Sequence, residues 1–97
     1  MRLLLAEDEK DLSNALCAIL KHNNYSVDPV FNGEDAYDYG MSENYDGIIL
    51  DLMMPKMNGL DVLRKLRENG ISTPVLILTA KAQTEDKILG LDCGADD

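Results

Sequence analysis

Two short runs of consecutive apolar residues constrain the fold of this chain most strongly. They cover residues 46–51, with Ile-Ile-Leu at the centre, and residues 74–78, Pro-Val-Leu-Ile-Leu. Successive side chains of a strand point to opposite faces, so a strand that is apolar at every position is covered on both faces. Such strands are typical of parallel sheets. We therefore predict two central strands of a parallel sheet that lies between layers of helices.

The segments before these runs also alternate between strand and helix patterns. Residues 3–6 predict a strand, and apolar residues at helical spacing over 12–20 predict a helix that ends at Asn23. A weaker strand pattern covers residues 25–31. Pro29 places that strand at an edge of the sheet, because proline donates no ladder hydrogen bond.

Three further segments have helical spacing. The first covers residues 34–41, the second begins after Asn58-Gly59 and ends near Asn69-Gly70, and the third is N-capped by Thr84 and ends near Gly94. This order predicts one α/β domain over the whole chain, with right-handed crossovers and ligands at the carboxyl ends of the strands. The predicted inward residues of the three helices are, in order, Ala36, Tyr37 and Gly40; Leu60, Val62, Leu63 and Leu66; and Ile88 and Leu91.

The composition restricts the class of partner. Eighteen acidic and nine basic residues give a formal charge of -9, which repels phosphate backbones and disfavours nucleic-acid binding by this segment. Cys17 and Cys93 lack CxxC spacing and are expected to be small buried apolar residues of a protein in a reducing cytoplasm. The sequence contains no signal-peptide pattern and no apolar run of membrane-spanning length.

Three acidic residues follow predicted strands. Glu7 and Asp8 come directly after the first strand, and Asp51 closes the third. At about 5 Å, two carboxylates repel by roughly 3 kcal/mol at an effective dielectric near 20, so such a cluster favours a bound cation. Ligands that are all oxygen favour magnesium and disfavour zinc.

These acids also allow a structural interpretation. Glu7 and Asp8 could serve as the cap and first-turn acids of the following helix, while Asp51 only begins a turn. Asp51 fits that alternative less well, because it ends an apolar strand where an unpaired charge is costly.

Four sequence landmarks resemble one protein family. Residues 48–59 (Ile-Ile-Leu-Asp-Leu-Met-Met-Pro-Lys-Met-Asn-Gly) resemble the phosphoacceptor signature of response-regulator receiver domains. The acidic pair within residues 6–9, Leu78-Thr79-Ala80 and the closing residues 94–97 agree with it in order and spacing. The resemblance covers the whole chain and is greatest to the winged-helix, OmpR/PhoB-like subfamily of transcription regulators.

The resemblance implies a fold and a function. The fold would be a flavodoxin-like doubly wound parallel sheet with strand order 2-1-3-4-5, of which the fifth strand and the fifth helix would be missing from this chain. A histidine kinase would phosphorylate Asp51 in a reaction that depends on magnesium, and a DNA-binding output domain in the full-length protein would respond. No turnover enzyme is expected.

The resemblance also implies roles for individual residues. Asp8 and Asp51 would ligate magnesium directly, Glu7 through water and Met53 through its backbone carbonyl. The Thr79 hydroxyl and the backbone N–H of Ala80 would bind phosphoryl oxygens, although a threonine after a strand can also simply cap a turn. Met53 and Lys81 are further expected to flank the phosphate.

One departure from the family concerns the carboxyl end. Family members carry a phosphate-contacting lysine at the end of a fifth strand, beyond the position of Asp97, and then a fifth helix. Without them the fourth strand, 75–78, would be an unprotected apolar edge, so a truncated domain, a homodimer or a swapped dimer is expected. We also expect this chain alone to be phosphorylated weakly or not at all.

Two other functions remain open from the sequence. An aspartyl-nucleophile phosphatase needs an Asp-x-Asp motif after its first strand, whereas glutamates flank Asp8 on both sides. A non-phosphorylated receiver-like interaction module is favoured slightly by the lysine that is missing, and opposed by the intact set of Glu7, Asp8, Asp51 and Thr79.

Overall fold

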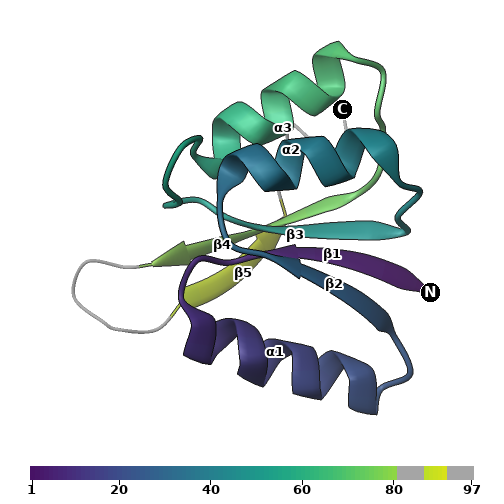
Figure 1. The fold of residues 1–97 in the computed structure, drawn as a ribbon, viewed down its shortest axis with the longest axis vertical. Coiled ribbons are helices and arrows are strands. Elements are labelled where there is room, and N and C mark those ends of the chain that lie inside the picture. The colour runs from purple at the N-terminus through teal and green to yellow at the C-terminus, as the bar shows by residue number, and fades with distance from the viewer. Residues whose placement is uncertain (81–86, 92–97) are drawn as a thin grey trace.

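A five-stranded sheet with helices on both faces forms the structure (Figure 1). This computed structural model describes residues 1–80 and 87–91. The strands lie in the order β2-β1-β3-β4-β5. Along the chain the elements are β1 (Arg2–Ala6), α1 (Lys10–His22), β2 (Ser26–Val30), α2 (Gly33–Ser42), β3 (Gly47–Asp51), α3 (Gly59–Glu68), β4 (Val75–Ala80) and β5 (Lys87–Leu91).

The first four strands are parallel, as the sequence predicts. β1 pairs with β2 on one side and with β3 on the other, and β3 also pairs with β4. β2 is therefore an edge strand, in agreement with the position of Pro29. The register sets Ala6 beside Leu50. Glu7, which directly follows β1, and Asp51, the last residue of β3, therefore lie at the same end of the sheet.

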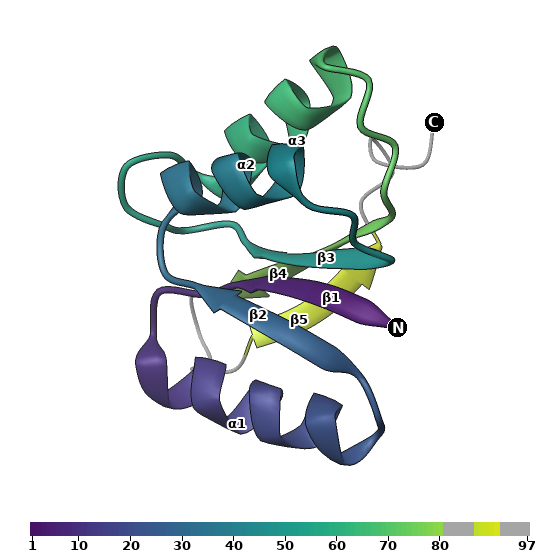
Figure 2. The ribbon, with the colours of Figure 1, turned by 45° about the vertical axis from the view of Figure 1, so that its right-hand side comes forward.

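The strands are covered on both faces (Figures 1 and 2). Helix α1 packs on one face, where Leu5 and Ile49 belong to one core cluster with Cys17 of the helix. Helices α2 and α3 pack on the other face, where Leu4 and Leu50 belong to a second cluster. Successive residues of β1 and β3 thus enter different cores, which confirms the reasoning from the consecutive apolar runs.

One predicted inward position is wrong, because Leu60 of α3 is 51% exposed. The buried residues of α1 are Ser13 and Cys17, and α3 buries Val62, Leu63 and Leu66 as predicted. Helical spacing gives the angular position of a side chain, but the width of the buried face depends on the neighbouring elements.

The helix predicted after β4 is also wrong. Residues Lys87–Leu91 form β5, which runs antiparallel to β4 with Thr79 opposite Ile88 and Ala80 opposite Lys87. A short apolar run has no periodicity that separates helix from strand. The backbone N–H and C=O groups along the edge of β4 favour pairing with another strand. Residues 87–91 form that strand as β5. The predicted cap Thr84 and the predicted helix end at Gly94 lie outside the described residues, as does Cys93.

Two helices begin with the same sequence motif. Asn32 precedes α2 and Asn58 precedes α3, and each is followed by glycine. The side-chain oxygen of each asparagine accepts the N–H of the residue three positions later, at 2.8 Å for Asp35 and 2.9 Å for Asp61. These are N-caps, which satisfy a helix-end donor and place an acid in the first turn.

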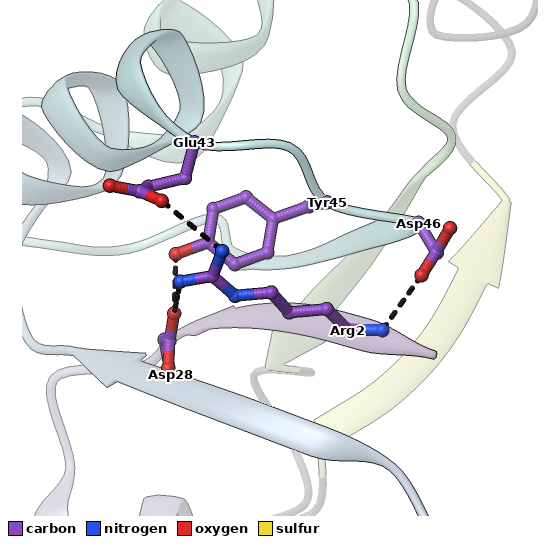
Figure 3. Close-up of polar contacts among 5 residues, drawn as sticks. All are labelled: Arg2, Asp28, Glu43, Tyr45 and Asp46. Carbon is purple, nitrogen blue, oxygen red and sulfur yellow. Dashed lines mark hydrogen bonds and ion pairs between the residues drawn. The ribbon is translucent and has the colours of Figure 1, made fainter.

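A polar cluster lies at the end of the sheet opposite the carboxyl ends of the strands (Figure 3). One carboxylate oxygen of Asp28 accepts hydrogen bonds from the Arg2 guanidinium and from the Tyr45 hydroxyl, both at 2.8 Å. Arg2 also contacts Glu43 at 3.1 Å, and its backbone N–H donates to Asp46 at 2.7 Å. The cluster joins β1, β2 and the segment between α2 and β3.

Within residues 1–80 and 87–91, none of the helices is long and apolar enough to cross a membrane.

Candidate functional site

The three acids predicted from the sequence converge at the carboxyl ends of β1 and β3. Glu7, Asp8 and Asp51 each offer a carboxylate oxygen, and these three oxygens all lie within 4.8 Å of one another. Glu7 and Asp51 are fully buried, whereas Asp8 is exposed to solvent. The convergence follows from the parallel register, because Ala6 and Leu50 are paired neighbours.

The alternative role of Glu7 and Asp8, to cap the following helix, is only partly observed. Helix α1 begins at Lys10, its N-cap is Glu9, and no side chain caps it. Glu7 accepts the backbone N–H of Glu9 at 2.9 Å, so this carboxylate does bind one amide at the start of the helix. Asp8 takes no part in a cap, and its exposed side chain stands beside two buried carboxylates.

The backbone after β3 folds closely around Asp51. Its Oδ1 accepts the N–H of Met53 at 3.2 Å, and the N–H of Gly59 donates to the carbonyl of Leu52 at 3.0 Å. A Cβ at Gly59 would lie 2.5 Å from the carbonyl oxygen of Asp51, too close for any other residue without movement of the backbone. Glycine at the start of α3 therefore lets the helix approach the acid.

The donor set matches a hard divalent cation. All three side chains present oxygen, and at an effective dielectric near 20 two buried charges about 5 Å apart, such as those of Glu7 and Asp51, repel by roughly 3 kcal/mol. A divalent cation placed among them adds attractions to each carboxylate that outweigh this repulsion. Magnesium prefers carboxylates together with water, and the exposed side of the cluster at Asp8 gives access to water.

The other predicted site residues fall in three groups. Met53 lies two residues after Asp51 and is 70% exposed, and its backbone contacts the site because its N–H donates to Asp51 at 3.2 Å. Thr79 and Ala80 were expected just after the fourth strand, but both lie within β4. Lys81 lies outside the described residues.

Sequence reasoning missed the importance of the two asparagine-glycine pairs. From the sequence, Asn32-Gly33 indicates only a turn and Asn58-Gly59 only a helix boundary. Both glycines are buried first residues of helices, and both face backbone of the loop or strand end at the site. The repeated Asn-Gly-x-Asp spacing was the signal that could have identified them as matching N-caps.

Comparisons with known proteins agree with this geometry. The response regulator receiver domain model matches residues 3–97. The transcriptional regulatory protein DltR of Streptococcus agalactiae is 52% identical over 97 residues, which is 100% of this chain and 43% of that protein. The response regulator ArlR of Staphylococcus aureus is 50% identical over 96 residues, covering 99% of this chain and 43% of that protein. The chain thus spans less than half the length of these relatives.

Solved structures show the same fold. The receiver domain of the Francisella response regulator 1452 aligns with a TM-score of 0.80 and 34% identity, over 87% of this chain and 69% of that chain. The response regulator TrrA of Thermotoga maritima, solved in complex with Mg2+-BeF, aligns with a TM-score of 0.78 and 34% identity, over 84% of this chain and 71% of that chain. The flavodoxin-like architecture predicted from the sequence is confirmed.

Proposed function

Because the chain belongs to the response regulator receiver domain family, we propose that Asp51 is its phosphoacceptor and that a histidine kinase supplies the phosphoryl group. The observation that carries the proposal is the convergence of Glu7, Asp8 and Asp51 within 4.8 Å at one edge of the sheet. An acid at the end of an apolar strand is costly, and a phosphoacceptor site gives that acid a chemical role.

Magnesium is the proposed cofactor. Asp8 and Asp51 would hold it directly, Glu7 through a water molecule and Met53 through its backbone carbonyl. When bound, the ion neutralises negative charge on the carboxylates and on the incoming phosphoryl oxygens. The TrrA structure, which contains Mg2+-BeF, supports this assignment for a relative with the same fold.

The residues of this chain have separate roles in the proposed transfer. A carboxylate oxygen of Asp51 attacks phosphorus, the bond from phosphorus to the histidine nitrogen of the kinase breaks, and an acyl phosphate forms. The Met53 N–H at 3.2 Å orients the Asp51 carboxylate. The Thr79 hydroxyl and the Ala80 N–H would donate to the phosphoryl oxygens.

The whole protein is proposed to control transcription. Its relatives DltR, a transcriptional regulatory protein, and ArlR, a response regulator, are more than twice as long as the matched region. A DNA-binding output domain would supply the contact with nucleic acid, since the charge of -9 disfavours such a contact here. Phosphorylation would alter the surface around β4 that partners bind.

Mass spectrometry after incubation with acetyl phosphate and magnesium tests the phosphoacceptor. We expect one phosphoryl group on a small fraction of chains, mapped to Asp51 and absent when magnesium is chelated. Asp51→Asn should take up no label, and Asp38→Asn, which removes an exposed acid of α2, should be labelled like the wild type.

Several outcomes would contradict the proposal. A label that survives in Asp51→Asn would remove Asp51 from the role, and continuous release of phosphate from a phosphoester would favour the phosphatase alternative. A chain that takes up no label and also binds no magnesium would favour the interaction module.

A further inference from the structure

We propose that Gly33 is a positioning residue for the metal site, because it lets the loop between β3 and α3 rest on the first turn of α2. This inference rests on the proposed function, since it concerns how the loop presents its backbone to magnesium. Gly33 itself lies on a different element from every proposed ligand.

The contact between loop and helix is made by backbone atoms. The N–H of Gly33 donates to the carbonyl of Pro55 at 3.2 Å, and the N–H of Met57 donates to that same carbonyl at 2.8 Å. Lys56, which lies between Pro55 and Met57, adopts a φ of 70°, and this turns the loop back toward α2. The N–H of Gly33 is one of the helix-end donors that lack a partner within α2, so the loop completes the helix terminus.

Only glycine leaves room for this arrangement. A Cβ at position 33 would lie 1.8 Å from the carbonyl oxygen of Met57 and 2.6 Å from its carbonyl carbon. Both atoms are backbone, so they can move only if the loop moves. The φ of Gly33 is not in the left-handed region, and a helix would otherwise favour alanine at this position. Packing against the loop, and not the helix, therefore requires glycine here.

The anchored loop leads directly to the phosphoacceptor. Pro55 is two residues from Met53, whose N–H donates to Asp51 and whose carbonyl is the proposed magnesium ligand. The exposed side chains of Lys56 and Glu34 add an ion pair at 3.8 Å across the same junction. Movement of the loop at residues 55–57 would therefore shift the Met53 carbonyl relative to the three carboxylates.

The test compares two glycines of the same helix in the full chain. Gly40, like Gly33, is buried in α2, but a Cβ there would meet the ends of the Leu66 side chain at 3.0 and 3.3 Å, and not backbone. We expect Gly33→Ala to weaken magnesium binding by about tenfold or more, the loss typical when a group that supports a metal ligand is disturbed. Gly40→Ala should bind magnesium like the wild type.

Metal affinity is measured by calorimetric titration with magnesium chloride, and the loop is followed separately by the NMR amide resonances of Met53 and Lys56. In the absence of metal, the chemical shifts of these resonances should differ from the wild type in Gly33→Ala and match the wild type in Gly40→Ala. A folded Gly33→Ala protein with wild-type magnesium affinity, or an equal loss in Gly40→Ala, would overturn the inference.

Two further results distinguish a failure of this inference from misfolding of the variant and from a failure of the proposed function. If circular dichroism shows that Gly33→Ala does not fold, Asn32→Ala decides, because it removes the cap of α2 without adding atoms. Unchanged magnesium affinity in Asn32→Ala would then overturn the inference. If the wild type binds no magnesium, the proposed function fails, and unmoved loop resonances in Gly33→Ala would overturn the positioning role independently.

Discussion

At the scale of single residues, the molecule concentrates its buried charge at one place. Among the described residues, the fully buried acids are Glu7 and Asp51, and their carboxylates lie together with that of Asp8. Moving a charged group out of water costs several kcal/mol unless hydrogen bonds or opposite charge offset it. The Glu9 and Met53 amides each offset part of this cost. A cation among the three oxygens offsets much more.

The polar cluster around Arg2, at the end of the sheet opposite the three acids, has a structural role. The hydrogen bond from Tyr45, and then the one from Arg2, lower the pKa of Asp28 below its ordinary value of 3.8. Burial, followed by the hydrogen bond to Asp28, raises the pKa of Tyr45 well above 10.0. Both shifts favour the pairing of a charged Asp28 with a neutral Tyr45 that is seen in the structure.

The cluster makes stability depend on pH at both extremes. Because the folded pKa of Asp28 lies below its unfolded value, its stabilisation is present above the unfolded pKa and is lost as the pH falls through the folded pKa. Because the folded pKa of Tyr45 is raised, its contribution is present below the unfolded pKa and is lost as the pH rises through the folded pKa.

Tyr45→Phe tests both statements. The variant should lose about 1 kcal/mol of unfolding free energy at neutral pH, the typical net contribution of one hydrogen bond in a protein. Its unfolding free energy should also depend less on pH below 4 and above 10 than that of the wild type. Urea unfolding across this pH range measures the effect. Parallel pH profiles for the two proteins would contradict the assignment.

At the scale of elements, the repeated Asn-Gly motif fixes where α2 and α3 begin. In α3, Asn58 accepts the N–H of Asp61 at 2.9 Å, and Gly59 approaches the backbone of Asp51. The cap and the glycine act together, because one fixes the first turn and the other lets that turn lie against the site.

The contribution of the α3 cap can be measured by mutation. Asn58→Ala should lower the unfolding free energy by about 1 kcal/mol, the usual cost of removing an N-cap side chain. Asn44→Ala, at an exposed position between α2 and β3, is the control and should change stability by less than about 0.5 kcal/mol. If both variants unfold at the same urea concentration, the Asn58 side chain does not cap the helix in solution.

The same scale shows which elements the sequence could predict. The four parallel strands and the first three helices follow from local patterns, since residues 48–50 enter two cores and Ala36, Val62 and Leu66 keep helical spacing. The structure of Lys87–Leu91 does not follow from a local pattern, because the segment forms a strand by pairing with the edge of β4. Leu60 is misplaced for a similar reason, since its exposure depends on what packs beside α3.

The candidate site was predictable because the parallel sheet converts sequence order into position. Glu7 and Asp8 follow the first predicted strand and Asp51 ends the third, and the family resemblance already implied that these two strands are neighbours, as the structure shows. The close approach of Gly33 to Met57 was not predictable, because it joins the first turn of α2 to the loop between β3 and α3, and no local sequence pattern contains that approach.

At the scale of the whole molecule, the sheet brings together acids that are more than forty residues apart in sequence. The chain carries a formal charge of -9, and its field attracts cations and repels phosphate donors. A bound divalent cation at the carboxyl ends of β1 and β3 would reverse that field locally, where the phosphoryl group must enter.

The most direct test of this account is a calorimetric magnesium titration of the wild type and of Asp51→Asn, with Asp38→Asn as the control for loss of one charge. We expect the wild type to bind one ion and Asp38→Asn to bind it equally well. Asp51→Asn should bind at least about tenfold more weakly, because removing one partner of a buried charge pair costs more than about 1.4 kcal/mol. Equal magnesium affinity in all three proteins would contradict the account.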